Sequence, residues 1–129
     1  PRFFVECNYS RQLGFQAAKR LLGLKNAPTA FFAQGDNMAL GVREAILTSG
    51  LKIPEDIALV GFDNIDVSAL TGIELTTINA KEYEMGAIAT ETLVNKIEGN
   101  APSMVSKIVL DVELIIRKSC GYNLYGYKR

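Results

Sequence analysis

Histidine is absent from this 129-residue sequence, and cysteine occurs only twice, as Cys7 and Cys120. Without histidine, no Ser-His-Asp triad can form within the chain. The two cysteines lie far apart in the sequence and lack the spacing of metal ligands, so zinc chemistry is excluded as well. We expect two free thiols in a reducing compartment, and we predict no metal site and no cofactor.

Net charge is also lacking, because fourteen Lys and Arg residues balance fourteen Asp and Glu residues. Binding to a phosphate backbone requires a basic surface, so we do not expect this chain alone to hold DNA. The sequence has no uninterrupted run of about 18 apolar residues, and its start, PRFFVECNYS, lacks the pattern of a signal peptide. We therefore expect a cytoplasmic protein that does not contact the membrane.

The chain is long enough for one domain, and its apolar fraction of 48% indicates a soluble, globular protein. Short β-rich runs alternate with helical stretches. This alternation predicts an α/β fold in which a parallel sheet has flanking crossover helices. The predicted strands are 2–6, 29–33, 57–62 and 75–80, with a strand-like run over 106–120; the predicted helices are 10–22, 37–49 and 81–98, and 122–129 is a tail.

The predicted helix 37–49 has apolar residues on two sides. One stripe suits burial against the sheet and consists of Met38, Ala39, Val42, Ala45 and Ile46. Leu40 and Leu47 lie seven residues apart on nearly the opposite side, between Arg43 and Glu44. This second stripe needs a cover from the same chain or from a partner molecule, unless the two leucines are simply exposed.

Polar side chains follow the ends of three predicted strands. In an open parallel sheet, ligands bind beyond the carboxyl ends of the strands. The set suits a neutral polyol, because carboxylates accept hydrogen bonds from hydroxyls, amides donate and accept them, and an aromatic ring stacks on a sugar or base. The candidate ligand-binding residues are Asn8 and Tyr9 after the first strand, Gln34 and Asp36 after the second, and Asp63 after the third.

Each candidate has a structural alternative. Asp36 could serve only as the N-cap of the helix that it opens, and Asp63 could cap a short turn through Val67 to Leu70. Ser10 suits the cap of the first helix, and Tyr9 could be a rim residue. An enzyme that uses Asp36 and Asp63 as acid and base is not expected, because the sequence has neither a nucleophile elbow nor a phosphate-binding loop.

Several blocks occur in a fixed order: PTAFFAQGDNMALGVREAILTSGLKIPEDIALVGFDN, then LTTI, EMGAIATETLVNKIEG and ELIIRKSCG. From about Val5 to Gly121 the chain resembles the effector-binding region of the lactose-repressor/galactose-repressor (LacI/GalR) family of bacterial transcription regulators. The resemblance implies a type I periplasmic-binding-protein-like fold, with two α/β lobes around a cleft and a helix-turn-helix head ahead of them. Residues 1–121 would be the carboxy-terminal part of that domain, a partial domain whose helix 81–98 belongs to the other lobe.

The resemblance also implies roles for particular residues. Asp63 matches an acid that contacts the effector, and Tyr9 matches an aromatic residue of the pocket. Gly35 and Asp36 match a position usually occupied by Asn-Asp, so one amide contact is missing here. Family dimers use the helix 37–49, so the resemblance places Leu40, Leu47, Arg43 and Glu44 at the dimer interface.

The resemblance predicts a ligand-sensing and dimerisation part of a transcriptional regulator, a repressor rather than an enzyme. Its partners would be a small sugar-like effector, a second copy of the chain, and DNA contacted only through the head that is not in this sequence. The helix 81–98 would lose its packing partner and fold elsewhere or cover a neighbour's surface. The alternative is a periplasmic sugar-binding protein of a transporter, which would share the fold and the pocket.

Overall fold

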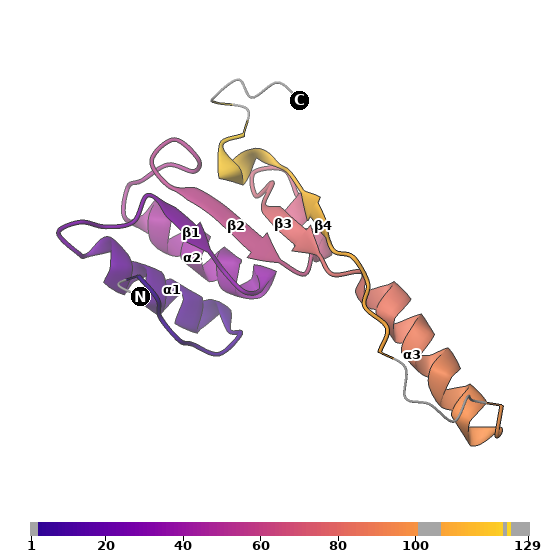
Figure 1. The fold of residues 1–129 in the computed structure, drawn as a ribbon. Coiled ribbons are helices and arrows are strands. Elements are labelled where there is room, and N and C mark those ends of the chain that lie inside the picture. Colours follow the sequence, from indigo (N-terminus) through magenta and orange to yellow (C-terminus); the bar gives the residue numbers. More distant parts are fainter. Residues whose placement is uncertain (1–2, 101–106, 123, 125–129) are drawn as a thin grey trace.

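The computed structural model describes residues 3–100, 107–122 and 124 (Figure 1). Helices and strands alternate as predicted through most of the chain. The predicted tail lies largely outside the described residues. The elements are α1 (Arg11–Leu22), β1 (Ala30–Phe32), α2 (Asp36–Thr48), β2 (Ala58–Phe62), η1 (Asp66–Ala69), β3 (Thr76–Asn79), α3 (Glu82–Ile97), β4 (Glu113–Ile115) and η2 (Lys118–Cys120).

Within the described residues, four strands form one sheet in the order β1-β2-β3-β4. The pairs β1–β2 and β2–β3 are parallel, whereas β3–β4 is antiparallel. The sheet is therefore mixed rather than wholly parallel. The reason is visible in Figure 1: the chain leaves β3 for α3 and then runs back along that helix, so β4 enters the sheet in the opposite direction.

The helices α1 and α2 pack closely against each other. Ser10 caps α1, as expected, because its Oγ accepts a hydrogen bond from the backbone N–H of Leu13 at 3.1 Å. At Gly41, an added Cβ would lie 1.9 Å from the carbonyl oxygen of Arg11. No side chain fits there, so the glycine allows the two helices to approach.

The core lies between α2 and the sheet. The predicted apolar stripe of α2 is confirmed as buried, with exposed fractions of at most 8%. Leu47 on the second stripe is exposed, and Leu40 is half-buried. The core cluster consists of Ala18, Ala33, Met38, Ala39, Val42, Ala45, Ile46, Ile57, Leu59 and Leu75.

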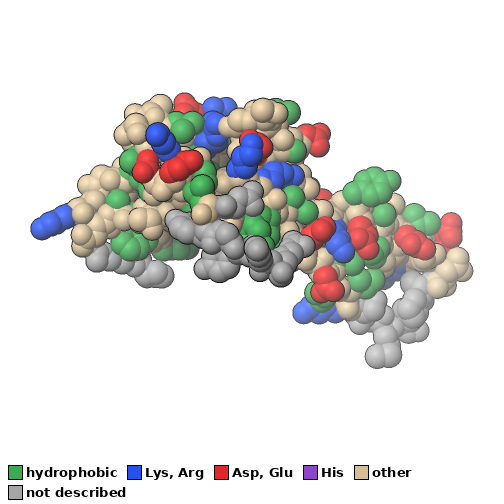
Figure 2. Space-filling view, turned by 90° about the horizontal axis from the view of Figure 1, so that it is seen from above, with side chains coloured by type: hydrophobic (Ala, Val, Ile, Leu, Met, Phe, Trp, Pro, Cys, Tyr) green, Lys and Arg blue, Asp and Glu red, His purple; other side chains and the backbone are tan. Residues whose placement is uncertain are grey.

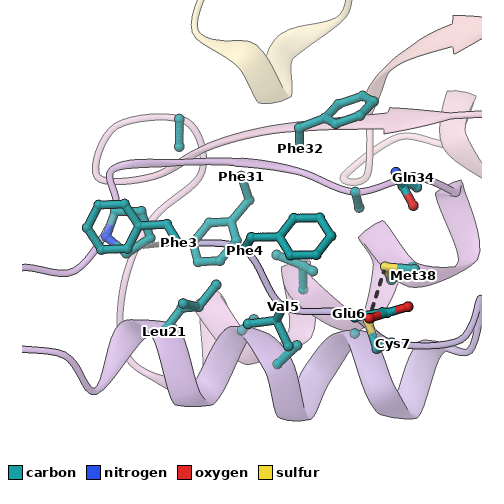
Figure 3. Close-up of a pocket in the computed structure, with 17 residues that line it drawn as sticks. Phe3, Phe4, Val5, Glu6, Cys7, Leu21, Phe31, Phe32, Gln34 and Met38 are labelled. Carbon is teal, nitrogen blue, oxygen red and sulfur yellow. Dashed lines mark hydrogen bonds between the residues drawn. The ribbon is translucent and has the colours of Figure 1, made fainter. Parts of the chain in front are cut away.

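Two predicted strands differ from the structure. Residues 3–6 form no strand. The segment runs beside the edge strand β1 and leaves a cavity of about 310 Å³, lined by Phe3, Phe4 and Phe31 among others (Figure 3). In the predicted run 106–120, only Glu113–Ile115 is a strand, because residues 107–112 lie along α3 and Lys118–Cys120 form a short turn of helix.

The helix α3 was predicted over 81–98 and forms over Glu82–Ile97. Together with residues 107–112 it projects from the body of the molecule, and we call these two segments the arm (Figure 1). No residue of α3 is buried. Figure 2 shows hydrophobic side chains at the surface of the arm, where Ile97 is 76% exposed and Val109 is 72% exposed.

Candidate functional site

The carboxyl ends of β1 and β2 meet beside the start of α1, as the sequence predicted for this edge. Gly35 lies at their centre, at the N-cap of α2. An added Cβ on Gly35 would lie 3.3 Å from Asp63 Oδ2 and 3.3 Å from Tyr9 Cδ1. The structure therefore brings the Tyr9 and Asp63 side chains together beside a residue that has no side chain.

Tyr9 and Asp63 together offer an aromatic ring beside a hydrogen-bond acceptor. The Tyr9 side chain is 70% exposed, and Asp63 is half-buried. Burial raises the pKa of the Asp63 carboxyl, the charges of Glu82 and Asp36 raise it further, and a hydrogen bond from the Asp36 backbone N–H lowers it. Because Glu82 is the first residue of α3, the arm begins within electrostatic reach of this site.

We call the surface formed by Tyr9 and Asp63 the rim. Asp36 is not part of this surface, because its exposed fraction is 0%. Its Oδ1 accepts a hydrogen bond from Thr77 Oγ1 at 2.7 Å. Its Oδ2 accepts from Ser68 Oγ at 2.5 Å and from the Ile65 backbone N–H at 3.1 Å. The carboxylate thus ties α2 to β3 and to η1, and it serves as a support for the residues around Asp63.

Neither capping alternative for the two acids holds. Gly35 is the N-cap of α2 and no side chain caps that helix, so Asp36 is its first helical residue. The N-cap of η1 is Ile65, not Asp63. The capping interpretation failed at Asp36 because its carboxylate bonds to residues 29 to 41 positions away, which no local pattern reveals.

The remaining candidates occupy the margins of the site. Asn8 is exposed, and its carbonyl oxygen accepts a hydrogen bond from the Ser10 backbone N–H at 2.6 Å. Gln34 is exposed and lines the cavity beside residues 3–7 together with Cys7 and Met38 (Figure 3). The structure places Gln34 at the end of β1 without linking it to Asp63.

One residue near the site, Arg117, was missed by the sequence analysis. Arg117 donates from Nη2 to Asn64 Oδ1 at 2.8 Å and from Nη1 to the Leu75 carbonyl oxygen at 2.7 Å. Asn64 follows Asp63 directly, but Arg117 lies 53 positions further along the chain. Arg117 lies in the segment 106–120, which was predicted as a strand, and nothing in that local pattern indicates this contact.

The residues predicted for a dimer interface lie along α2. Leu47 is 42% exposed. Arg43 donates to the Gly72 carbonyl oxygen, and Glu44 forms an exposed ion pair with Arg11 at 2.9 Å. Leu47 is thus the exposed apolar residue of this set, while the two charged residues have contacts within the chain.

The described residues contain no cluster of His, Cys, Asp or Glu that could hold a metal ion. Across residues 3–100 and 107–122, no helix is both long enough and apolar enough to cross a membrane.

Comparisons with known proteins agree on one family. Residues 3–120 match the family described as periplasmic binding protein-like domain. The HTH-type transcriptional repressor CytR of Escherichia coli (strain K12) is 38% identical over 119 residues, which cover 92% of this chain and 35% of that protein. The chain thus spans about a third of the length of this curated relative.

Solved structures agree with this match. A LacI-family transcriptional regulatory protein from Corynebacterium glutamicum superposes with a TM-score of 0.81 at 28% identity, over 90% of this chain and 44% of that chain. The lac repressor dimer bound to operator and the anti-inducer ONPF superposes with a TM-score of 0.78 at 32% identity, over 88% and 34%. The chain therefore belongs to the periplasmic binding protein-like domain family, in the form found in LacI-family transcriptional regulators.

Proposed function

We propose that this chain is the ligand-sensing part of a LacI-family transcriptional repressor, and that it binds a small sugar-like effector at the rim formed by Tyr9 and Asp63. The observation that supports the proposal is the placement of these two side chains beside Gly35. A ring and a carboxylate side by side suit a sugar, because the ring stacks on its apolar face while the carboxylate accepts hydrogen bonds from its hydroxyls.

Asp36 acts in this proposal through the residues that it holds. Its buried carboxylate bonds to the Ile65 backbone, two residues after Asp63. Asn8 and Gln34, both exposed, would contribute contacts at the edge of the pocket. With glycine at position 35, an amide side-chain contact to the effector would be missing.

The proposed mechanism requires the second lobe, which lies outside this chain. An effector that bridges the two lobes binds the closed arrangement more tightly than the open one, so it shifts the equilibrium between them. A coupling free energy of about 1 to 3 kcal/mol is enough to change how a paired DNA-binding head sits on its operator. The arm would carry its apolar residues into that second lobe.

The proposal includes a cytoplasmic homodimer that uses α2. Leu47 and the half-buried Leu40 would face the partner subunit. DNA would be contacted only through a head outside this chain, since the chain has no net charge. The reported relatives are regulators, which favours gene regulation over the alternative of a transporter's sugar-binding protein.

A thermal-shift screen of the full-length protein against sugars, sugar phosphates and nucleosides tests the proposal. A compound at 100 times its dissociation constant stabilises the folded state by about 2.7 kcal/mol. That stabilisation should vanish in Asp63→Ala and persist in Glu55→Ala, which removes an exposed acid away from the rim. Stabilisation that survives Asp63→Ala would place the pocket elsewhere.

A further inference from the structure

The loop after β2 holds an unusual backbone conformation. We call residues 63–65 the Asp63 turn. Asp63 has a φ of 103° and Asn64 a φ of 56°, so two consecutive residues other than glycine lie at positive φ. Positive φ is unfavourable for residues that have a Cβ, and it persists only where the surrounding structure imposes it. The direction of the Asp63 carboxylate therefore depends on whatever holds this turn.

Three backbone N–H groups fix the turn to the core. The Asp63 N–H donates to the Ile78 carbonyl oxygen at 2.9 Å. The Asn64 N–H donates to Thr77 Oγ1 at 3.3 Å, and the Ile65 N–H donates to Asp36 Oδ2 at 3.1 Å. These bonds hold the turn against β3 and α2.

The side chain of Asn64 is held by a fourth contact, from Arg117. Its Oδ1 accepts from Arg117 Nη2 at 2.8 Å, a hydrogen bond to a charged donor. Arg117 is itself fixed on β3. Its Nη1 donates to the Leu75 carbonyl oxygen at 2.7 Å, and its backbone N–H donates to Thr76 Oγ1 at 2.9 Å.

Arg117 also connects the turn to β4, which is one of the two strands that carry the arm. Arg117 follows the last residue of β4 by two positions. The ladder between β3 and β4 ends, on the side of the arm, at the pair Asn79 and Glu113. Beyond that pair, the chain leaves along β3 into α3 and returns along residues 107–112 into β4 (Figure 1). The turn and the arm therefore share β4, which the arm enters at Glu113 and which Arg117 follows at its other end.

We propose that Arg117 is the positioning residue of the Asp63 turn, and that its hydrogen bond to Asn64 links this turn to the strands that carry the arm. This inference rests on the proposed function, because it concerns the carboxylate that we assign to the effector. Binding at Asp63 and the orientation of the arm then depend on each other, and such a dependence is reciprocal.

The test is an NMR titration of the Asp63 carboxyl in the 129-residue chain. Charged groups on two elements face this carboxyl, namely Glu82 on α3 and Asp36 on α2, and both raise its pKa. Arg117→Met should release the turn, so that the carboxyl becomes more hydrated and its pKa falls toward the usual 3.8. Loss of the positive charge alone would raise the pKa, so the sign separates the two causes.

Asn64→Gly removes the same hydrogen bond from the other side and keeps a residue that accepts positive φ. It should lower the Asp63 pKa in the same direction, and the double variant should lower it no further than Arg117→Met. Lys118→Met is the matched control, because Lys118 pairs with Glu74 at 2.7 Å and its described contacts do not include the turn. It should leave the Asp63 pKa unchanged.

Double-mutant cycles that combine Glu82→Gln with Arg117→Met or Asn64→Gly test the link to the arm. In the parent chain this substitution should lower the Asp63 pKa, because the charge of Glu82 raises it. In the Arg117→Met and Asn64→Gly backgrounds, Glu82→Gln should lower the Asp63 pKa by less, since the turn is no longer held beside the start of α3. An equal effect in all three backgrounds would overturn the link.

A constant or raised Asp63 pKa in Arg117→Met, with the core methyl signals of Ile46 and Leu59 still dispersed, would overturn the positioning role. If Arg117→Met unfolds, Asn64→Gly decides alone, and an unchanged pKa in that variant has the same meaning. The titration uses no effector. Its failure would leave the effector site intact, and a failed effector screen would leave the positioning result intact.

Discussion

At the scale of single residues, the buried Asp36 carboxylate supports the rim without reaching it. It receives hydrogen bonds from two side chains and one backbone N–H, and its residue is fully buried. Gly61 leaves the space that the carboxylate occupies, because an added Cβ there would lie 2.1 Å from Asp36 Oδ1. Removal of the carboxylate would leave several buried donors without an acceptor.

We expect Asp36→Ala to lower the free energy of unfolding by about 3 kcal/mol, because unsatisfied buried polar groups are costly. Urea unfolding should show a lower midpoint with an unchanged slope. Asp66→Ala, which removes an exposed acid at the start of η1, serves as the control and should have little effect. Equal midpoints for the two variants would contradict the support role.

The acids Asp63 and Glu74 should give opposite dependences of stability on pH. The folded pKa of Asp63 is raised, chiefly by burial, so the folded state favours its protonated form. Its contribution to stability is present below pH 3.8 and is lost as the pH rises through the folded pKa. The folded pKa of Glu74 is lowered, chiefly by its hydrogen bond from Lys118, so its contribution is present above pH 4.5 and is lost on acidification.

Asp63→Asn should therefore stabilise the chain at neutral pH, and Glu74→Gln should destabilise it. Both differences from the parent should disappear at low pH, where each acid is protonated in the folded and the unfolded states. Thermal unfolding of the three chains across the acidic range measures this. A destabilising Asp63→Asn at neutral pH would show that burial does not dominate at this carboxyl.

The pairing of Tyr9 with Asp63 was predicted from the sequence by placing both after strands of one parallel sheet, whose carboxyl ends meet. Only Asp63 follows a strand in the structure, because residues 3–6 form none. The sequence did not predict the contact of Arg117 with Asn64, since that contact depends on the antiparallel return of β4. The rim could be inferred from local pattern, but its supports are bonds between distant positions.

At the scale of elements, helices were predicted more closely than strands. The helices α1, α2 and α3 begin and end within one residue of their predicted bounds, because apolar periodicity extends over many residues. Residues 3–6 have the composition of a strand yet pair with no neighbour in the described sheet. Composition indicates an extended segment, but a strand also requires a partner along its edge.

Two glycine positions inside helices should respond in opposite ways to alanine. At Gly41 the added Cβ would collide with the Arg11 carbonyl oxygen, whereas at Gly86 it would meet no atom within 4 Å apart from the adjacent backbone of α3 itself. Gly41→Ala should destabilise the chain by about 1–3 kcal/mol through overpacking. Gly86→Ala should stabilise α3 by about 0.5–1 kcal/mol, because alanine is the better helix former.

Circular dichroism during urea unfolding, together with amide hydrogen exchange in α3, measures both effects. The Gly86→Ala variant should slow exchange within α3 and leave α1 and α2 unchanged. If Gly41→Ala retained the parent's unfolding midpoint, the close packing of α1 on α2 would have to be abandoned.

At the scale of the whole molecule, the body and the arm differ in how they bury apolar residues. The body has a core with fully buried side chains, whereas the arm holds an open apolar groove of about 670 Å³. The groove is lined by Met85, Ile88, Ala89, Leu93, Ile108, Val109 and Val112 among others. Exposed apolar patches of this kind favour association with another surface.

We expect the 129-residue chain to self-associate through the arm, with an apparent mass that rises with concentration in sedimentation velocity. Leu93→Lys, within the groove, should weaken this association. Leu47→Lys on α2 removes the apolar contact of the proposed homodimer, so the association that remains in this variant belongs to the arm. A monomer at all concentrations would contradict the expectation, and loss of association only in Leu47→Lys would assign it to α2.

The arm is joined to the body by two covalent connections that meet at one point, the ladder pair of Asn79 and Glu113. A segment joined in this way could be exchanged as a unit between related chains. A chimaera cut at this pair would keep Tyr9 and Asp63 while replacing the segment that begins with Glu82. Modular exchange of this sort would let relatives alter the segment that begins with Glu82 without rebuilding the surface formed by Tyr9 and Asp63.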